Sequence, residues 1–504
     1  MTRPRIEHAA VVAGVAYLVL AVVLHPRWTM DDAYISLRFA TNLAQHGQLA
    51  WNLTGSPVEG YTGVLLPLLL AAAIRVSLPA LQLTEALNAV AVITSGVLVY
   101  AILRLHQVHR WLTLGAVLVF CLNPFLPTQA LSGLETGLFM LGLTAAVWLF
   151  ARLETVRGAG WANEVALGIA LLLTCLARPE GVLLAAAALT ALVFLRRRQG
   201  RPWLASTARV GLTVAVPGVS YLAWTNFYYG GILPNTFYVK AGTAGTVGDS
   251  AVAIVVFVLA SLALPVVAGW SLARTPPGPV RRPLTATLAL AVGGALLVSY
   301  LRADLIQNIG FRFFVPALPL ILVGLALVLD RRHRDGFRLT GAARYVAVGT
   351  LVVQLLASLS LLGARRAQDA AYGQLIMDEH KPAGDYIAAT VPRNAVLAVC
   401  VDAGAIPYYS GLDAIDMGGL NDRHLARDHL TLAQKVDYLF SRRPQVIVLT
   451  SDAPDRSVGG PDIAGAVGAD PRLAGYRLAR SFGTRASGWE HYYQLVYLSR
   501  DMPG

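Results

Sequence analysis

The stretch WTMDDAYISLRFATNL, Trp28 to Leu43, follows a long apolar run and places two acids at its edge. Beyond the acids, Ile35, Phe39 and Leu43 recur at i, i+4 and i+8, a spacing that predicts a helix with one apolar face. Gly47 is expected to stop this helix, because glycine readily adopts the left-handed backbone found at helix C-termini. The chain is therefore expected to pass from an apolar segment into an amphipathic helix that begins at an acidic pair.

The acidic pair, Asp31 and Asp32, has two interpretations. An Asp at the start of a helix is typical of an N-cap, which explains one acid but not two. The second carboxylate would lie in the field of the helix N-terminus, which favours its ionised form. A general base or a cation ligand requires that form, so the pair is predicted to be functional, with one member also capping the helix.

The composition places most of the chain in a membrane. Of the 504 residues, 56% are hydrophobic and 14% are charged, against roughly 25% charged in a soluble domain. Apolar runs of about 20 residues, enough to cross about 30 Å of hydrocarbon, recur from Ala9 to Gly363, whereas Ala364 to Gly504 has mixed polarity. The prediction is an α-helical polytopic membrane domain over 1–363 and a small α/β domain over 364–504.

The formal net charge of +12 could indicate a nucleic-acid partner. The arginines lie instead in short clusters between apolar runs, which is the positive-inside pattern of membrane proteins. These clusters, expected in the cytoplasm with the N-terminus, are 104–110, 152–157, 196–201, 274–282 and 331–338. Cys121, Cys175 and Cys400 are scattered, without metal-ligand spacing or an expected disulfide.

Because all of the basic clusters are expected in the cytoplasm, the number of membrane crossings between any two of them must be even. The run 63–78 is interrupted by prolines and an arginine, and is predicted to be a juxtamembrane or re-entrant segment within the outer loop 25–83. The remaining runs give about eleven spans, at 9–24, 84–103, 111–128, 134–151, 165–177, 181–195, 207–225, 250–273, 284–301, 313–330 and 342–363. A signal peptide is the alternative for 9–24, but a small-residue cleavage site is missing. An odd count puts the C-terminal domain outside the cytoplasm, on a protein of the cytoplasmic (inner) membrane.

Polar residues that packing does not explain fall at the outer ends of these spans and in the outer loop. They are Asp31, Asp32, Glu59, Glu135, Arg178, Glu180, Lys240, Arg302, Asp304 and Arg312. Ionisable groups at membrane depth are costly and usually mark a site. A few acids combined with several cations suit a substrate that carries an anionic phosphate and a group needing deprotonation or metal.

Several of these residues also have a structural interpretation. Glu135 in SGLET could belong to a capping box, and Arg178 could pair with Glu180 across the bend between two helices. Arg302 and Arg312 could snorkel to the membrane interface.

Two loop segments also have both a structural and a functional interpretation. Glu59 in SPVEGYTG could be a solvated acid in an ordinary turn. The aromatic residues of NFYYGGILPNTFYVKAG, 226–242, are expected as an interfacial belt whatever the function. Lys240 within that segment could hold a phosphate as a point charge.

Five segments, in this order along the chain, resemble the membrane glycosyltransferases of the GT-C superfamily. They are WTMDDAYISLRFATNLAQHGQLAWN, VEGYT, SGLETGL, RPEGVLL and NFYYGGILPNTFYVKAG. Together with DAGAIPYYSGLDAIDMGGLND, 402–422, they look most like the mycobacterial terminal β-(1→2)-arabinofuranosyltransferases and their relatives. The resemblance covers most of the chain.

This resemblance implies transfer of a sugar, with arabinofuranose as one candidate, from a polyprenyl-phosphate donor to a cell-envelope glycan or glycolipid acceptor. It implies that Asp31 acts as general base or orients the acceptor and that Asp32 assists it, with both as candidate ligands of a divalent cation, Mg or Mn. The residues implied for the donor phosphate are Lys240, Arg178, Arg312 and Arg302. Those implied for the acceptor or sugar are Glu59, Tyr61, Glu135, Glu180, Asn235 and Tyr238.

The C-terminal domain has its own pattern. Segments 395–400, 445–450 and 491–498 are predicted strands, and 367–379 and 428–440 are predicted helices. The domain lacks a GxGxxG or P-loop sequence, so it is expected to cover the active site or to bind glycan. Its candidate contacts to sugar hydroxyls are Asp402, Tyr408, Tyr409, Asp416 and Asp422.

Two further function classes compete with a glycosyltransferase. A non-enzymatic lipid or glycan transporter or flippase would need polar residues near mid-membrane, where this chain is nearly all apolar. An envelope-assembly scaffold would keep its function when Asp31 is replaced by Asn.

Overall fold

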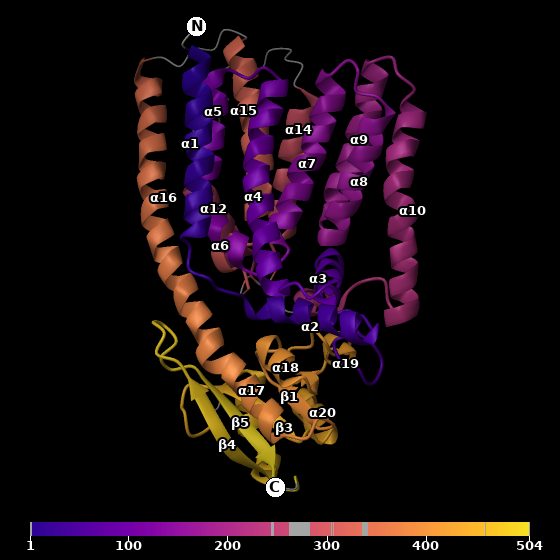
Figure 1. The fold of residues 1–504 in the computed structure, drawn as a ribbon, viewed down its shortest axis with the longest axis vertical. Helices are drawn as coiled ribbons and strands as arrows, with labels where there is room; N and C mark the ends of the chain where they lie inside the picture. The colour runs from indigo at the N-terminus through magenta and orange to yellow at the C-terminus, as the bar shows by residue number, and fades with distance from the viewer. Residues whose placement is uncertain are drawn as a thin grey trace.

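A computed structural model gives the structure of the protein and describes residues 3–242, 246–261, 283–303, 305, 307–334, 341–458 and 460–502. Figure 1 shows two parts, a bundle of long helices and a smaller domain with a β-sheet at one end of it. The N-terminus lies at the opposite end of the bundle. The end of the bundle that faces the C-terminal domain is called the domain end below.

The bundle is built from long apolar helices that lie side by side (Figure 1). They are α1 (Arg3–Val23), α4 (Ala80–Leu105), α5 (Arg110–Cys121), α7 (Thr136–Thr155), α8 (Trp161–Ala177), α9 (Gly181–Arg198), α10 (Trp203–Tyr229), α12 (Val247–Ser261), α14 (Leu284–Ser299), α15 (Leu318–Arg334) and α16 (Gly341–Leu375). Their inward faces form one continuous apolar core. On α10 the apolar residues Leu212, Val216 and Val219 are exposed, as expected for a helix that faces lipid.

Three helices are long and apolar enough to cross a membrane among the residues that the structure describes, namely Ala80–Leu105, Thr136–Thr155 and Ile309–Arg331. The other bundle helices overlap the runs expected to span, and the count of eleven spans stays a prediction. The predicted span 250–273 lies partly outside the described residues. The run 63–78 forms only α3 (Leu65–Arg75), whose 11 residues extend about 17 Å, too short to cross.

Short helices lie at the domain end of the bundle. They are α2 (Asp31–His46), α3, α6 (Leu126–Leu131), α11 (Asn235–Gly242), η1 (Ile309–Phe311) and η2 (Val315–Ala317). Gly47 ends α2 with φ of 72°, as expected. The expected acidic cap is wrong, because Met30 occupies the N-cap position and Asp31 and Asp32 are the first helical residues. The roles of the two acids therefore come from contacts outside α2.

One helix joins the two parts. α16 runs unbroken to Leu375 and continues through a π-helical turn, η3 (Ile376–His380), into α17 (Lys381–Thr390). The domain boundary expected at 363 therefore falls inside a helix. A π-turn holds an extra residue and is frequent at functional sites. Here Glu379 and His380 are both buried, with exposed fractions of 0% and 1%.

The C-terminal domain is a five-stranded mixed sheet with strand order β2-β1-β3-β5-β4. Its strands are β1 (Val396–Val399), β2 (Asp413–Asp416), β3 (Val446–Ser451), β4 (Tyr476–Gly483) and β5 (Tyr493–Ser499). β2, β1 and β3 are parallel, and β5 pairs antiparallel with β3 and β4. The remaining elements are α18 (Ala405–Ser410), α19 (Arg423–Arg427), α20 (Leu432–Ser441), α21 (Ile463–Gly468) and η4 (Pro471–Gly475).

The three predicted strands are confirmed as β1, β3 and β5, whereas β2 and β4 were not predicted. β2 has only four residues with an Asp at each end, and β4 carries two arginines, so neither has a clear apolar pattern. The helix predicted at 428–440 starts later, at Leu432, because Thr431 and Gln434 form a capping box there.

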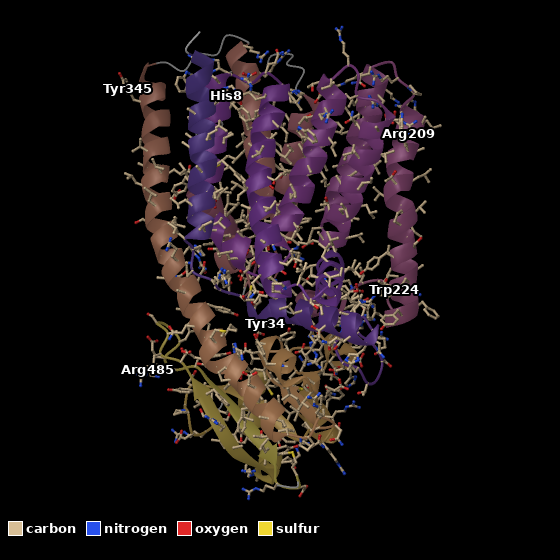
Figure 2. The ribbon with its side chains drawn as sticks, in the orientation of Figure 1. His8, Tyr34, Arg209, Trp224, Tyr345 and Arg485 are labelled. Atoms are coloured by element: carbon tan, nitrogen blue, oxygen red, sulfur yellow. The ribbon has the colours of Figure 1, made fainter. Side chains whose placement is uncertain are left out.

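The two parts meet through α2. Figure 2 shows Tyr34 at this junction, whereas His8 and Arg209 lie at the far end of the bundle. The ring of Tyr34 is 5.6 Å from that of Tyr408 and 5.5 Å from that of Tyr409, both on α18. The acidic end of α2 is thereby placed against the C-terminal domain.

Candidate functional site

A cavity of about 270 Å³ lies where the domain end of the bundle meets the C-terminal domain. Its ionisable and phenolic lining residues are Asp31, Asp32, Tyr61, Glu135, Arg312, Tyr372, Asp402 and Asp416. The first five were predicted site residues, and Asp402 and Asp416 were predicted sugar contacts. These eight residues are up to 385 positions apart in the chain.

Asp31 is held by the backbone of the C-terminal domain. Its Oδ2 accepts the N–H of Gly404 and its Oδ1 the N–H of Ala405, each at 2.8 Å. Burial raises the pKa of Asp31 from 3.8 to about 6; His380 opposes this shift and Asp402 adds to it. Each carboxylate oxygen keeps a second lone pair, so Asp31 can still accept a proton from a ligand in the cavity.

Asp32 and Arg312 form the charged wall on the bundle side. Nη1 of Arg312 lies 3.2 Å from Oδ2 of Asp32 and 3.0 Å from the sulfur of Met30. Its guanidinium carbon lies 4.8 Å from the ring centroid of Phe313, a cation–π distance. Arg312 is buried, with an exposed fraction of 6%, so the alternative of a side chain snorkelling to the interface is wrong for it.

Asp402 brings a carboxylate from the loop after β1. Its Oδ2 accepts the O–H of Tyr492 at 2.6 Å and Nε2–H of Gln494 at 2.7 Å, and lies 3.1 Å from Nε2 of His380. Burial opposes ionisation of Asp402, but His380 and these hydrogen bonds outweigh it and lower its pKa. Asp402 is therefore an anion at neutral pH.

Asp416, the last residue of β2, also lines the cavity. Its Oδ1 accepts the N–H of Gly418 at 2.9 Å, and its Oδ2 accepts the N–H of Asn421 at 2.9 Å and the Nδ2–H of Asn421 at 3.0 Å. Burial raises the pKa of Asp416 to about 6. Both oxygens are used within the loop, so Asp416 shapes that loop.

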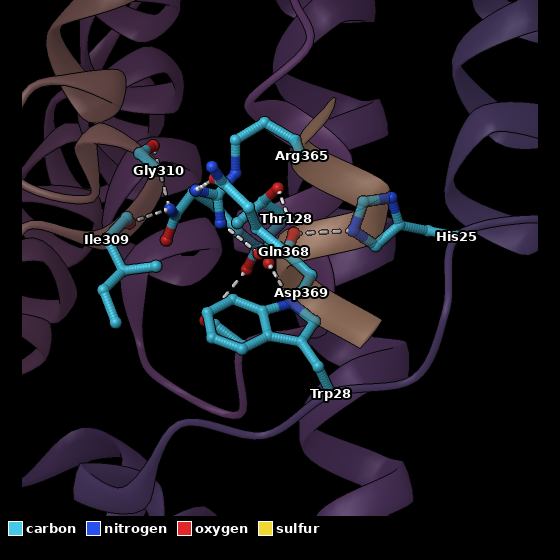
Figure 3. A network of polar contacts seen from close by, with 10 residues as sticks. His25, Trp28, Thr128, Ile309, Gly310, Arg365, Gln368 and Asp369 are labelled. Atoms are coloured by element: carbon cyan, nitrogen blue, oxygen red, sulfur yellow. Dashed lines mark hydrogen bonds and ion pairs between the residues drawn. The ribbon is translucent and has the colours of Figure 1, made fainter. Parts of the chain in front are cut away.

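A buried polar network fixes the segment that leads into Asp31 (Figure 3). Asp369 of α16 accepts the hydroxyl of Thr128 at 2.6 Å, lies 2.8 Å from Nε2 of His25, and pairs with Arg365. The indole of Trp28 donates to the carbonyl of Thr128 at 3.1 Å. The approach to the acidic pair is thus anchored to both α16 and α6.

Arg178 lies behind the cavity wall. It is 1% exposed, with Nε 3.5 Å from Oε1 of Glu135 and Nη2 3.7 Å from Oε1 of Glu180. Pairing of Arg178 with Glu180, one of the two interpretations from sequence, is confirmed. The capping box at Glu135 is wrong, because Glu135 stands at the N-cap of α7 without a side-chain capping bond.

The remaining predicted residues are not among those that line the cavity. Glu59 is buried, accepts the hydroxyl of Tyr221 at 2.7 Å, and has its pKa raised to about 7 by burial. The Nε of Arg427 donates to Oδ1 of Asn235 at 3.2 Å, and its guanidinium lies 4.4 Å from the ring of Tyr238.

Arg302, Lys240 and Asp304 were also among the polar residues predicted at the outer ends of the spans. Arg302 is exposed in the turn that follows α14. The side chain of Lys240 and residue Asp304 lie outside the described residues.

Sequence reasoning missed three residues around the cavity, namely Tyr372, Glu379 and His380. Tyr372 lines the cavity, and its hydroxyl accepts the N–H of Asp31 at 3.3 Å. Burial raises the pKa of Glu379 to about 8. A histidine next to two acids, DEH at 378–380, was the available signal.

The divalent cation predicted for Asp31 and Asp32 stays a prediction. Both oxygens of Asp31 accept backbone N–H groups, and Nη1 of Arg312 lies 3.2 Å from Oδ2 of Asp32. Among the described residues, no three His, Cys, Asp or Glu side chains converge on one point.

A family model described as a domain of unknown function, DUF8728, matches residues 368–497, which correspond to the C-terminal domain. Comparison with curated proteins gives no match.

Solved structures share the fold along nearly the whole chain. Archaeal oligosaccharyltransferase AglB from Archaeoglobus fulgidus, in complex with an inhibitory peptide and a dolichol-phosphate, has a TM-score of 0.58 at 13% identity, over 89% of this chain and 70% of that one. ArnT from Cupriavidus metallidurans, bound to undecaprenyl phosphate, has a TM-score of 0.55 at 14% identity, over 97% of each chain.

Arabinofuranosyltransferase AftD from Mycobacteria has a TM-score of 0.53 at 14% identity, over 98% of this chain and 41% of that one. At these sequence identities, the three comparisons show that the fold is shared. The chain has the fold of the multi-pass membrane glycosyltransferases of the GT-C superfamily, as the sequence resemblance implied.

Proposed function

We propose that the protein is a glycosyltransferase that moves a sugar from a polyprenyl-phosphate donor to a cell-envelope glycan or glycolipid. The observation that carries this proposal is the cavity in which Asp31, Asp32 and Arg312 lie together at the junction of the two parts. Undecaprenyl phosphate and dolichol-phosphate, bound by two proteins of the same fold, support a lipid phosphate as the donor. Arabinofuranose is one candidate for the sugar, because AftD shares the fold.

The chemistry needs a base and a cation. In this proposal the acceptor hydroxyl gives its proton to the carboxylate of Asp31 while its oxygen forms a bond to the anomeric carbon of the donor sugar. The bond from that carbon to the phosphate oxygen breaks, and the electron pair stays on the lipid phosphate. Arg312, already buried beside the cavity, would stabilise the charge that develops on this phosphate. Asp32 orients Arg312 through their ion pair at 3.2 Å.

The value of Asp31 as a base follows from its pKa. A base works best when its pKa lies just below the operating pH, because it is then mostly ionised and still attracts a proton. With a pKa of about 6, Asp31 meets this condition at pH 7. Lys240 is retained as a further candidate for the donor phosphate. The basic clusters between the apolar runs support a reaction on the side of the membrane away from the cytoplasm.

The test is a donor screen with the purified full chain. Short-chain polyprenyl-phosphate sugars, including the arabinofuranosyl donor, are offered with a mixture of glycoside acceptors, and linkage analysis identifies the product. Asp31→Asn should insert and fold normally and should abolish transfer. Near-normal turnover of this variant would refute the role of Asp31. Movement of intact lipid across vesicles without any transfer would favour a flippase instead.

A further inference from the structure

The carboxylate of Asp402 is held asymmetrically. All of its hydrogen bonds and ion pairs with described residues fall on Oδ2, which receives hydrogen bonds from Tyr492 and Gln494 and lies 3.1 Å from Nε2 of His380. None of the described residues donates to Oδ1, although the side chain lines the cavity. One oxygen is thus fixed by the C-terminal domain and the other is presented to a ligand.

This asymmetry distinguishes Asp402 from Asp31 and Asp416, two buried acids that also line the cavity. Asp31 uses one oxygen for each of two backbone N–H groups, and Asp416 uses both of its oxygens within its own loop. A carboxylate that is anchored through one oxygen keeps a defined orientation for the second. Such a preorganised acceptor binds a hydroxyl with little loss of side-chain entropy.

His380 sets this orientation from the end of η3, the turn that follows α16. It is 1% exposed and lies on the π-turn η3, which carries the bundle helix into the C-terminal domain. Burial of its ring opposes protonation, but Asp402 outweighs this and raises the pKa of His380 to about 9. His380 and Asp402 therefore form an ion pair at neutral pH. A buried ion pair of this kind holds its geometry, because breaking it leaves an uncompensated charge.

The charges around the cavity also restrict the acceptor. Carboxylates line both the bundle side and the domain side, and the guanidinium of Arg312 is paired with Asp32 on the bundle side. An acceptor that carries its own negative charge would be repelled near Asp402. A sugar hydroxyl is instead a hydrogen-bond donor, which is what an ionised carboxylate requires.

We propose that Oδ1 of Asp402 binds a hydroxyl of a neutral sugar acceptor, and that His380 positions this carboxylate. This inference rests on the proposed glycosyltransferase function and names the chemical class of its acceptor. Asp402 is an acceptor-binding residue, whereas His380 acts through Asp402.

The experiment compares Asp402→Asn and His380→Gln with Asp437→Asn as a matched control. Asp437 is an exposed acid of the same domain, 68% exposed and paired with Arg472. The probes are octyl arabinofuranoside, a neutral acceptor, and an octyl uronide, which carries a carboxylate. Apparent constants for acceptor and for polyprenyl-phosphate donor are measured separately on the full-length protein, with melting temperature as a check on folding.

Asp402→Asn should raise the acceptor KM roughly 10- to 100-fold, the worth of one hydrogen bond to a charged group, and leave the donor KM within about twofold. His380→Gln should shift the same constant by a smaller factor, and the control should shift neither. The wild-type protein should discriminate against the uronide. An unchanged acceptor KM in a folded Asp402→Asn variant would overturn the inference while leaving the proposed function intact. Equal use of the uronide would overturn the assignment to neutral sugars.

A direct binding measurement tests the acceptor site even if the protein transfers no sugar. Binding of octyl arabinofuranoside is followed by tryptophan fluorescence, because the ring of Trp489 lies 5.4 Å from that of Tyr492, which donates to Asp402. If no donor supports transfer, saturable binding that Asp402→Asn abolishes would uphold the acceptor site alone. Absence of both transfer and binding in the wild-type protein would overturn both proposals.

Discussion

Arg38 on α2 connects the two parts of the protein through several hydrogen bonds. Its guanidinium donates to the carbonyl of Trp51 at 2.5 Å, to that of Leu412 at 2.6 Å and to that of Pro407, and to Oδ1 of Asn52 at 3.1 Å. The side chain is 6% exposed, and burial lowers its pKa to about 10. Trp51 and Asn52 belong to the loop after α2, whereas Pro407 and Leu412 belong to the C-terminal domain. Arg38 therefore ties that loop and α2 to the C-terminal domain.

Arg38→Met keeps the length of the side chain and removes every donor. Each buried carbonyl left without its partner costs about 1–3 kcal/mol, and relief of the buried charge returns part of this. We expect docking of the C-terminal domain to weaken by about 3 kcal/mol, which corresponds to a roughly 100-fold change in equilibrium constant.

Amide hydrogen exchange over residues 407–416 measures this change directly, because local opening exposes those backbone groups. Protection should fall roughly 100-fold in Arg38→Met. Arg485→Met, a change at an exposed arginine of the same domain, is the matched control and should alter nothing there. Protection that stays within about threefold of the wild type would refute the role assigned to Arg38.

Four further predictions follow from individual residues. The transfer rate should rise with pH and reach half its maximum near pH 6, the pKa of Asp31; a rate that increases toward pH 5 would contradict its role as base. Glu379 has a folded pKa of about 8, above its ordinary 4.5, so the stability that its protonated form contributes is lost as pH rises through 8. Glu379→Gln should therefore raise the melting temperature by ~3 °C or more at pH 9 and leave it unchanged at pH 5, and an equal shift at both values would count against this account. Gly404→Ala should destabilise the junction and reduce transfer at least tenfold, because its Cβ would lie 1.9 Å from the carbonyl oxygen of Asp31; Gly475→Ala, with nothing within 4 Å, is the control. Lys240→Ala should raise the apparent constant for the lipid-phosphate donor by about tenfold and affect that for the acceptor less, and equal changes in both would argue against a phosphate contact.

The helical part of the fold was predictable because membrane spans carry a strong local signal. Long apolar runs and the basic clusters between them located α4, α7 and the other bundle helices without any tertiary information. In the C-terminal domain, β1, β3 and β5 are buried strands, and their short apolar runs made them predictable from local sequence. β2 begins and ends with Asp and is held by pairing with β1, a contact between distant segments that no local pattern reveals.

The site was predictable only in part. Asp31, Asp32 and Arg312 stood out because ionisable groups at the ends of apolar runs are expensive. Arg178 had the same signal, yet it lies behind the cavity, where it contacts Glu135 and Glu180. Its place could not be predicted, because sequence spacing does not give the direction in which a buried side chain points.

The contacts that complete the site are long-range. Asp31 and Gly404, whose N–H it accepts, are 373 positions apart. His380 depends on the π-turn that brings it to Asp402. Such pairings arise from packing of the two parts, and a single sequence carries no record of them.

This arrangement makes assembly of the site depend on docking of the domain. The proposed base, Asp31, belongs to the bundle, but both of its carboxylate oxygens are oriented by N–H groups of the C-terminal domain. Conversely, Asp402 belongs to the domain, but His380, which fixes it, lies on the continuation of bundle helix α16. Each part therefore positions a site residue of the other. Weakening the junction at Arg38 should then disturb base and acceptor contacts together, whereas changing Asp402 alone disturbs only the acceptor. That difference separates a fault in domain docking from a fault in acceptor recognition.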